Sequence, residues 1–122
     1  LDLYVADYGN HRIQLFKAGQ LNVTTVAGVD STPSIALYNP TAVFLDADGY
    51  SFIVDTFNYR IIGSRSNGFF CVVGCSHVIG SASDQLDMPD SAAFDSYGNI
   101  YVTDTFNDRI QKFNLLTNIS GK

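Results

Sequence analysis

The sequence predicts an all-β fold built from a repeated unit of four short strands. Three observations carry this prediction. All 12 acidic residues are aspartates, so the helix former Glu is absent, whereas Phe, Tyr, Val, Ile and Thr are frequent. A polar motif recurs about every 48 residues. Short apolar runs alternate with turn signals that contain Gly, Asp and Asn.

The repeated motif consists of an apolar run, Asp, two residues, Asn, one residue, Arg and Ile. From Asp7 to Asp55 is 48 positions, and from Asp55 to Asp104 is 49. A second landmark, Leu37 to Pro40, recurs 49 positions later as Leu86 to Pro89. The polar positions of the three copies are Asp7, Asn10 and Arg12, then Asp55, Asn58 and Arg60, then Asp104, Asn107 and Arg109.

The middle copy shows how one period divides into strands. We expect strands over residues 42–45, 52–54, 60–64 and 69–73. Turns are expected at 46–49 and 55–58, and Asn67-Gly68 has the composition of a type I′ hairpin turn. The second strand is apolar at successive positions, so both of its faces must be covered. Stacked neighbouring sheets would cover both.

Four strands in a period near 48 residues predict a β-propeller, in which four-stranded blades surround a channel. We expect three strands of a first blade in residues 1–28, a complete second blade in 41–75 and most of a third in 91–122. Propellers close with about four to eight blades. The chain also begins at Leu1 without a signal-peptide pattern, so we interpret it as a section of a longer protein whose further blades are its partners.

The repeat resembles the NHL repeat, which is named for Asn-His-Leu. Asn10-His11-Arg12-Ile13 carries the resemblance most directly, and Val26-Ala-Gly28 and Leu37-x-x-Pro40 stand where that repeat has its fourth-strand and inter-blade signatures. His occurs only in the first copy, with Tyr59 and Asp108 at the same step of the other two. The resemblance implies a propeller used as a binding platform in ubiquitin ligases and secreted proteins, as an RNA reader or, in one known group, as an amidating lyase with a metal at the ring centre.

Composition and charge limit the possible partners. With 46% hydrophobic and 16% charged residues, the chain is typical of a globular protein. Its net charge of -5 lacks the clustered cations that phosphate binding needs, so we expect no nucleic acid partner. The longest uncharged stretch, Ser66 to Ser83, is rich in Gly and Ser, so we expect no membrane insertion.

The repeated polar motif favours a structural role over a catalytic one. An Asp at a strand end caps turn amides, and an Arg opening the next strand pairs back to it. Asp46, Asp48 and Asp95 suit hairpin turns better than a calcium loop. The two histidines, His11 and His77, do not complete a zinc site. We therefore expect no catalytic residue, no metal and no cofactor within this segment.

The two cysteines and two glycosylation sequons indicate the cellular compartment of the protein. A bridge between Cys71 and Cys75 requires the chain to double back at Gly74, since a straight strand would separate the two Cα atoms by about 13 Å. Free thiols remain the alternative. Asn22 and Asn118 each lie in an N-glycosylation sequon. Together these features favour an extracellular, secreted protein, with a cytoplasmic ubiquitin-ligase arm as the alternative.

We expect a non-catalytic binding function, with a protein or a small extracellular ligand as the partner. The turns between second and third strands share one rim of a propeller with the connectors between blades. The expected binding residues on this rim are Tyr8, His11, Phe57, Tyr59, Phe106 and Asp108. The alternative for Phe57 and Phe106 is burial between adjacent blades. The alternative functions are part of a metal-dependent propeller lyase or hydrolase, or the substrate-recognition arm of a ubiquitin ligase, with RNA binding less favoured.

Overall fold

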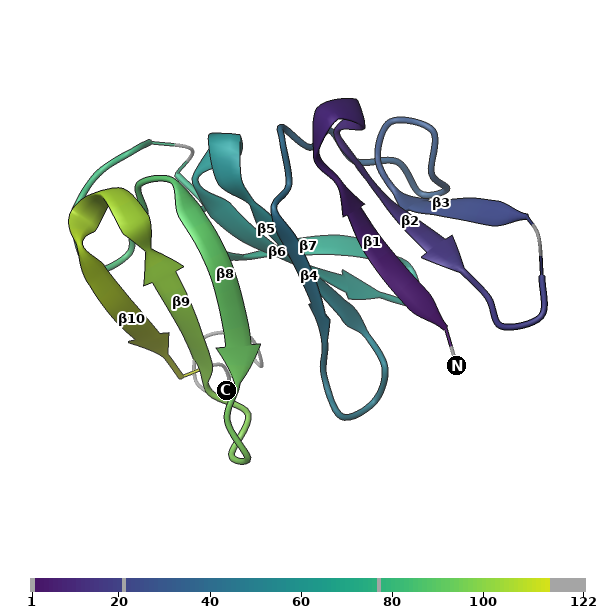
Figure 1. The fold of residues 1–122 in the computed structure, drawn as a ribbon. Helices are drawn as coiled ribbons and strands as arrows, with labels where there is room; N and C mark the ends of the chain where they lie inside the picture. Colours follow the sequence, from purple (N-terminus) through teal and green to yellow (C-terminus); the bar gives the residue numbers. More distant parts are fainter. Residues whose placement is uncertain (1, 21, 77, 115–122) are drawn as a thin grey trace.

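Three antiparallel sheets follow one another along the chain in the computed structural model, which describes residues 2–20, 22–76 and 78–114 (Figure 1). The strand orders are β1-β2-β3, β4-β5-β6-β7 and β10-β9-β8. The all-β prediction is therefore confirmed. The strands are β1 (Leu3–Asp7), β2 (Arg12–Phe16), β3 (Val23–Ala27), β4 (Ala42–Leu45), β5 (Ser51–Asp55), β6 (Arg60–Arg65), β7 (Gly68–Val73), β8 (Pro89–Phe94), β9 (Ile100–Asp104) and β10 (Arg109–Phe113).

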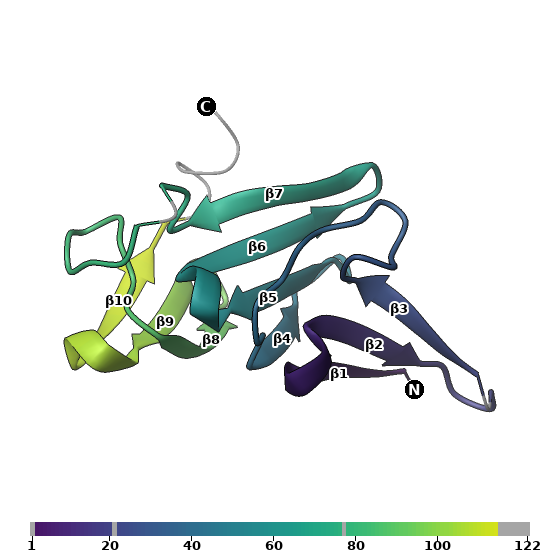
Figure 2. The same ribbon diagram turned by 90° about the horizontal axis from the view of Figure 1, so that it is seen from above.

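The three sheets are copies of one pattern. The repeated Asp ends β1, β5 and β9, so these strands correspond to one another. Within the described residues, the first sheet has no strand that corresponds to β4, and the third has none that corresponds to β7. Viewed from above, β1, β4 and β8 lie on one side of the arc and β7 lies on the opposite side (Figure 2). Contacts of β4 with both β1 and β8 join the three sheets along the first side.

The hairpin turns show which turn chemistry the sequence encodes. In the β4–β5 turn, Asp46 Oδ1 accepts hydrogen bonds from the amides of Asp48 and Tyr50, and Gly49 has a φ of 86°. The β6–β7 turn differs from the type I′ turn expected at Asn67-Gly68. Arg65 pairs with Gly68, so the central residues are Ser66 and Asn67, and neither has a positive φ. The expectation was wrong because the register placed Gly68 in the strand.

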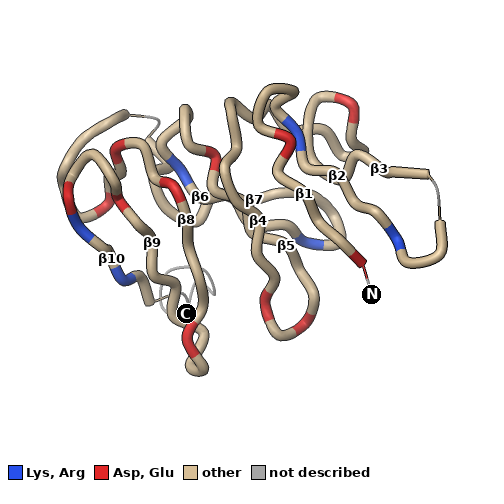
Figure 3. Tube along the Cα trace, viewed as in Figure 1, with Lys and Arg blue, Asp and Glu red and all other residues tan. Residues whose placement is uncertain are grey.

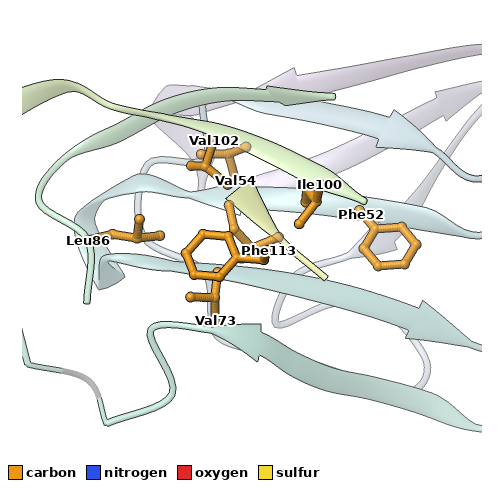
Figure 4. Close-up of a cluster of buried hydrophobic side chains, with 8 residues drawn as sticks. Phe52, Val54, Val73, Leu86, Ile100, Val102 and Phe113 are labelled. Carbon is orange, nitrogen blue, oxygen red and sulfur yellow. The ribbon is translucent and has the colours of Figure 1, made fainter. Parts of the chain in front are cut away.

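Successive residues of β5 face different neighbours. Ile53 belongs to a buried cluster that also contains Ile13, Ala27, Leu37 and Ile62, at the junction of the first and second sheets. Val54 belongs to a second cluster, at the junction of the second and third sheets (Figure 4). Both residues are fully buried, and burying a side chain of this size stabilises a fold by about 1.5–3 kcal/mol. The second cluster consists of Phe52, Val54, Ile61, Val73, Leu86, Ile100, Val102 and Phe113.

Among the described residues, none covers Ile110 on the outer face of the third sheet. Ile110 is 70% exposed, whereas Ile13 and Ile61 at the same position of the repeat are fully buried by the sheet that follows them. A further sheet would bury Ile110 in the same way. No helix in the described part of the chain is long and apolar enough to cross a membrane.

Candidate binding rim

Each copy of the motif closes the link between its two strands. The link is a single 3₁₀ turn, η1 (Tyr8–Asn10), η2 (Thr56–Asn58) or η3 (Thr105–Asn107). In the second copy, Asp55 Oδ2 accepts hydrogen bonds from Asn58 Nδ2 at 2.9 Å and from Arg60 Nε at 2.7 Å. The first and third copies repeat the arrangement, with Arg Nε to Asp Oδ2 distances of 2.8 Å. We call each Asp-Asn-Arg set a clamp.

The second and third clamps also hold the connectors that lead into their sheets. Asp55 Oδ1 accepts the amide hydrogen of Tyr38 at 2.7 Å, and Arg60 donates to the Ala36 carbonyl. Asp104 Oδ1 accepts the amide hydrogen of Asp87 at 2.7 Å. Arg109 donates to three carbonyls of the same connector, those of Ser81, Ala82 and Gln85. The clamps therefore use their polar groups to fix the rim.

Two of the clamp aspartates, Asp7 and Asp104, have lowered pKa values. Burial by itself raises the pKa of Asp104, but hydrogen bonds from the Asp87 amide, Asn107, Arg109 and Gln111 outweigh it, so the pKa lies below the ordinary value. For Asp7, hydrogen bonds from Arg12 and then from Asn10 lower the pKa. Carboxylates held ionised in this way are hydrogen-bond acceptors rather than proton donors near neutral pH.

The residue that ends each 3₁₀ turn is left-handed and variable. His11, Tyr59 and Asp108 have φ values of 55°, 55° and 53°. His11 Nδ1 accepts a hydrogen bond from the amide of Asn39 at 2.9 Å. Among the described residues, the side chains of Tyr59 and Asp108 have no hydrogen-bond partner. The first sheet is therefore tied to the following connector by a contact that the second sheet lacks.

Four rings gather where the rim crosses from the first sheet to the second. Phe57 lies edge-on to Tyr8, with ring centroids 6.3 Å apart, and Tyr38 lies 5.3 Å from Phe57. Tyr38 also meets the His11 ring at 5.5 Å. Phe57 is half-buried by these contacts, whereas Tyr8 and Tyr38 stay about half exposed.

The same rim is open where the second sheet meets the third. Phe106 corresponds to Phe57 but is 67% exposed. Thr56 stands at the position of Tyr8, and Asp87 stands at the position of Tyr38, so among the described residues no ring covers Phe106. Asp87 Oδ1 is buried and has no hydrogen-bond partner. The two expected fates of these phenylalanines, contact with a neighbouring blade and exposure on the rim, thus both occur.

The opposite rim holds a cavity between the second and third sheets. Its volume is about 670 Å³, and its walls include Phe52 and Phe70 of the second sheet and Phe94 of the third. Arg65 lies over the Phe70 ring, 4.1 Å from its centroid. At the first junction, Val26 of β3 and Phe69 of β7 pack on one cluster, so outer strands meet there. Phe70 of β7 thus lines this cavity, whereas its neighbour Phe69 packs on the cluster at the first junction.

The other predicted sites have varied outcomes. Cys71 and Cys75 form a disulfide, with Cα atoms 5.7 Å apart and a φ of 77° at Gly74, so the expected doubling back is confirmed. Asn22 is exposed. His77 and Asn118 lie outside the described residues. No group of three or more His, Cys or Asp within the described ranges is arranged to hold a metal ion.

Sequence reasoning missed the contribution of the connectors to the rim. Tyr38 and Asn39 carry the aromatic and hydrogen-bond contacts at the first junction. Both lie within the repeated landmark from Leu37 to Pro40. The recurrence of this landmark with the period of the clamp motif was the signal in the sequence, but it does not specify the path that brings Tyr38 to the rim.

Comparison with known proteins supports the fold alone. No family model matches the chain, and no curated protein matches it. A solved structure, selenomethionine-substituted virginiamycin B lyase from Staphylococcus aureus, is similar with a TM-score of 0.61 and 11% sequence identity. The match covers 93% of this chain and 38% of that one. That neighbour is a β-propeller protein, so this chain has the fold of a β-propeller section and spans less than half of the neighbour.

Proposed function

We propose that this chain is a section of an NHL-type β-propeller that acts as a non-catalytic binding platform, and that its binding surface is the clamp-bearing rim. The observation that carries the proposal is that the backbone of this rim is held by hydrogen bonds while aromatic side chains on it remain exposed to solvent. The clamps hold the turns and connectors with short hydrogen bonds. Rings of Tyr8, Tyr38 and Phe106 remain about half exposed or more on that fixed frame.

Further blades of the same chain are the proposed neighbours at the ends of the arc. Support comes from Ile110, which is exposed where the corresponding Ile13 and Ile61 are buried. Repeat arrays draw stability from the contacts between neighbours. Residues 1–122 alone are therefore expected to unfold in a broad transition, and a sharp, reversible transition of a monomer would contradict this part of the proposal.

An extracellular setting completes the proposal, with a cytoplasmic one as the alternative. The disulfide supports it, since such bonds persist in oxidising compartments. An exposed sequon asparagine, Asn22, is compatible with glycosylation. The natural partner would be a protein or a small extracellular ligand.

A lyase is the second candidate, because the similar solved structure carries that name. The likeness at 11% identity extends to the fold. A ubiquitin-ligase arm remains a proposal from the NHL resemblance. The sequence flanking this segment distinguishes them, since a RING domain and B-box favour the ligase and additional inward-facing histidines favour the enzyme.

Substitution on the rim tests the binding proposal. In the full-length protein with its identified partner, Tyr59→Asn and Asp108→Asn are expected to weaken binding without lowering the melting temperature, because Asn tolerates the left-handed backbone at both positions. Tyr8→Ala is expected to weaken binding as well, with a lower melting temperature because its ring also packs against Phe57. Tyr97→Ala is the matched control, since Tyr97 is 80% exposed in the β8–β9 turn on the opposite rim. Binding that is lost in the control and kept in the rim variants would contradict the proposal.

A further inference from the structure

We infer that the rim between the second and third sheets binds a positively charged group, such as a Lys or Arg side chain of a protein partner, with Phe106 as its contact surface. This inference rests on the proposed binding function and adds the chemistry of the partner. It follows from three observations on Phe106, on the carboxylates around it and on the nearby cations.

Phe106 is exposed because of which residues the preceding sheet and connector carry at this rim. The rings that cover the corresponding Phe57 come from the preceding sheet and the preceding connector. Both the preceding sheet and, apart from position 77, the preceding connector are described for Phe106. They carry Thr56 and Asp87 in place of the two tyrosines. The exposure of Phe106 therefore does not result from the lack of a sheet after the third one. The backbone is nevertheless fixed, because the Phe106 amide donates to the Asp87 carbonyl at 3.0 Å.

Aspartates occupy the backbone segments next to Phe106. The Asp87 carbonyl accepts a hydrogen bond from the Phe106 amide. The Asp87 side chain adds a negative charge close to Phe106, although its Oδ1 is buried and has no hydrogen-bond partner among the described residues. Asp108 is exposed two residues beyond Phe106, in a left-handed conformation. Asp84 is exposed in the connector held by Arg109. Figure 3 shows several acidic segments around the upper ends of β8, β9 and β10.

The arginines at this rim are already committed. Arg60 is only 12% exposed and pairs with Asp55, and Arg109 pairs with Asp104 and donates to connector carbonyls. In the described part of the chain, neither forms a salt bridge with Asp84, Asp87 or Asp108. A cation placed over an aromatic face is attracted by the ring, and neighbouring carboxylates add to that attraction. An exposed phenylalanine among uncompensated carboxylates therefore selects a cationic side chain over a neutral or acidic one.

A pair of peptides tests the charge requirement in the full-length protein. The probe is an acetylated, fluorescently labelled heptapeptide of alternating Gly and Arg, and its counterpart has citrulline at each Arg. Citrulline keeps the shape of arginine and removes its charge. We expect the arginine peptide to bind at least tenfold more tightly by fluorescence anisotropy. Equal affinities, or no binding of the arginine peptide, would overturn the inference.

Matched variants locate the site. Phe106→Ala is expected to weaken the arginine peptide about fivefold, as is Asp108→Asn, in which Asn tolerates the left-handed backbone. The controls are Tyr97→Ala and Asp48→Asn on the opposite rim, which remove the same ring type or the same charge. They are expected to change affinity less than twofold. Equal losses for Asp48→Asn and Asp108→Asn would show attraction to overall charge and would overturn the inference.

The same measurements separate this inference from the binding function beneath it. If the citrulline peptide binds as well as the arginine peptide and Phe106→Ala weakens both, the rim binds but does not select a cation. If Phe106→Ala changes neither peptide while the natural partner still depends on Tyr8, the binding function stands and this site is wrong. Melting temperatures of all four variants verify folding.

Discussion

The two junctions of this arc are built from one repeat and end in different surfaces. At the first junction, Tyr8 and Tyr38 cover Phe57, and His11 accepts a hydrogen bond from the connector. At the second, Thr56 and Asp87 stand in those places and Phe106 is exposed. The clamps beneath are nearly the same in both. The comparison teaches that the clamp fixes the backbone of the rim, while a few variable positions decide whether an aromatic ring packs internally or faces a partner.

The largest expected effect comes from breaking the clamp that lies under the first junction. Asp55 is fully buried and holds Arg60, Asn58 and the Tyr38 amide. Asp55→Ala leaves buried donors without an acceptor, and we expect a loss of about 3–5 kcal/mol of unfolding free energy. Chemical denaturation measures it.

Asp7→Ala within residues 1–122 is the informative comparison, because the first clamp is partly exposed there and no connector in the described residues donates to Asp7. Its effect is expected to be much smaller. Equal losses for the two variants would show that burial and connector contacts do not distinguish the clamps.

The disulfide distinguishes the second connector from the first. It closes a short loop, with a sequence separation of four, at the exit of β7, and loop-closure entropy assigns such a loop about 2 kcal/mol. Reduction is expected to speed amide exchange after Cys75 and leave residues 29–39 unchanged. Hydrogen exchange with and without reductant measures this. Intact-mass analysis after alkylation of the unreduced protein should show no adduct, and two adducts would contradict the bridge.

Removing one ring sharpens the comparison directly. Tyr38→Asp gives the first junction the residue of the second, and we expect a loss of about 0.5–1.5 kcal/mol as Phe57 loses its partner. Tyr97→Asp serves as the control, since Tyr97 is 80% exposed. Thermal unfolding of both variants checks the expectation, and equal shifts would mean that the ring contact contributes nothing.

Lowering the pH is expected to remove the stabilising contribution of Asp104 step by step as its carboxylate becomes protonated. The pKa of Asp104 is lower in the folded protein than the ordinary value of about 3.9, so its contribution to stability is present above that value and lost as pH falls through the folded pKa. Asp104→Asn should therefore reduce the dependence of the melting temperature on pH below about 4. Asp48→Asn should leave it unchanged, and an unaltered slope in Asp104→Asn would contradict the assignment.

The repeat made the strands and clamps predictable, because a period fixes which residues correspond even before any of them is placed. Tyr38 could not be assigned to the rim in that way, since its contact with Phe57 joins residues from a connector whose path the motif does not specify. The Asn67-Gly68 turn was misplaced because pairing of Arg65 with Gly68 moved the loop by one residue. The cavity beside Phe70 could not be predicted, because its walls come from two different sheets and no local sequence pattern encodes how they meet.

The hydrogen bond from each connector amide to a clamp aspartate also has a consequence for how such chains grow. Tyr38 and Asp87 each lie 17 residues before the aspartate that holds them. Each connector is thus fastened to the sheet that follows it in the chain. A duplicated segment that starts just after the last strand of one sheet, such as β3, and ends with the last strand of the next, such as β7, contains both partners of this hydrogen bond. A segment cut between Tyr38 and Asp55 separates the two partners. Insertions and deletions of whole blades should accordingly have their boundaries immediately after the outer strand.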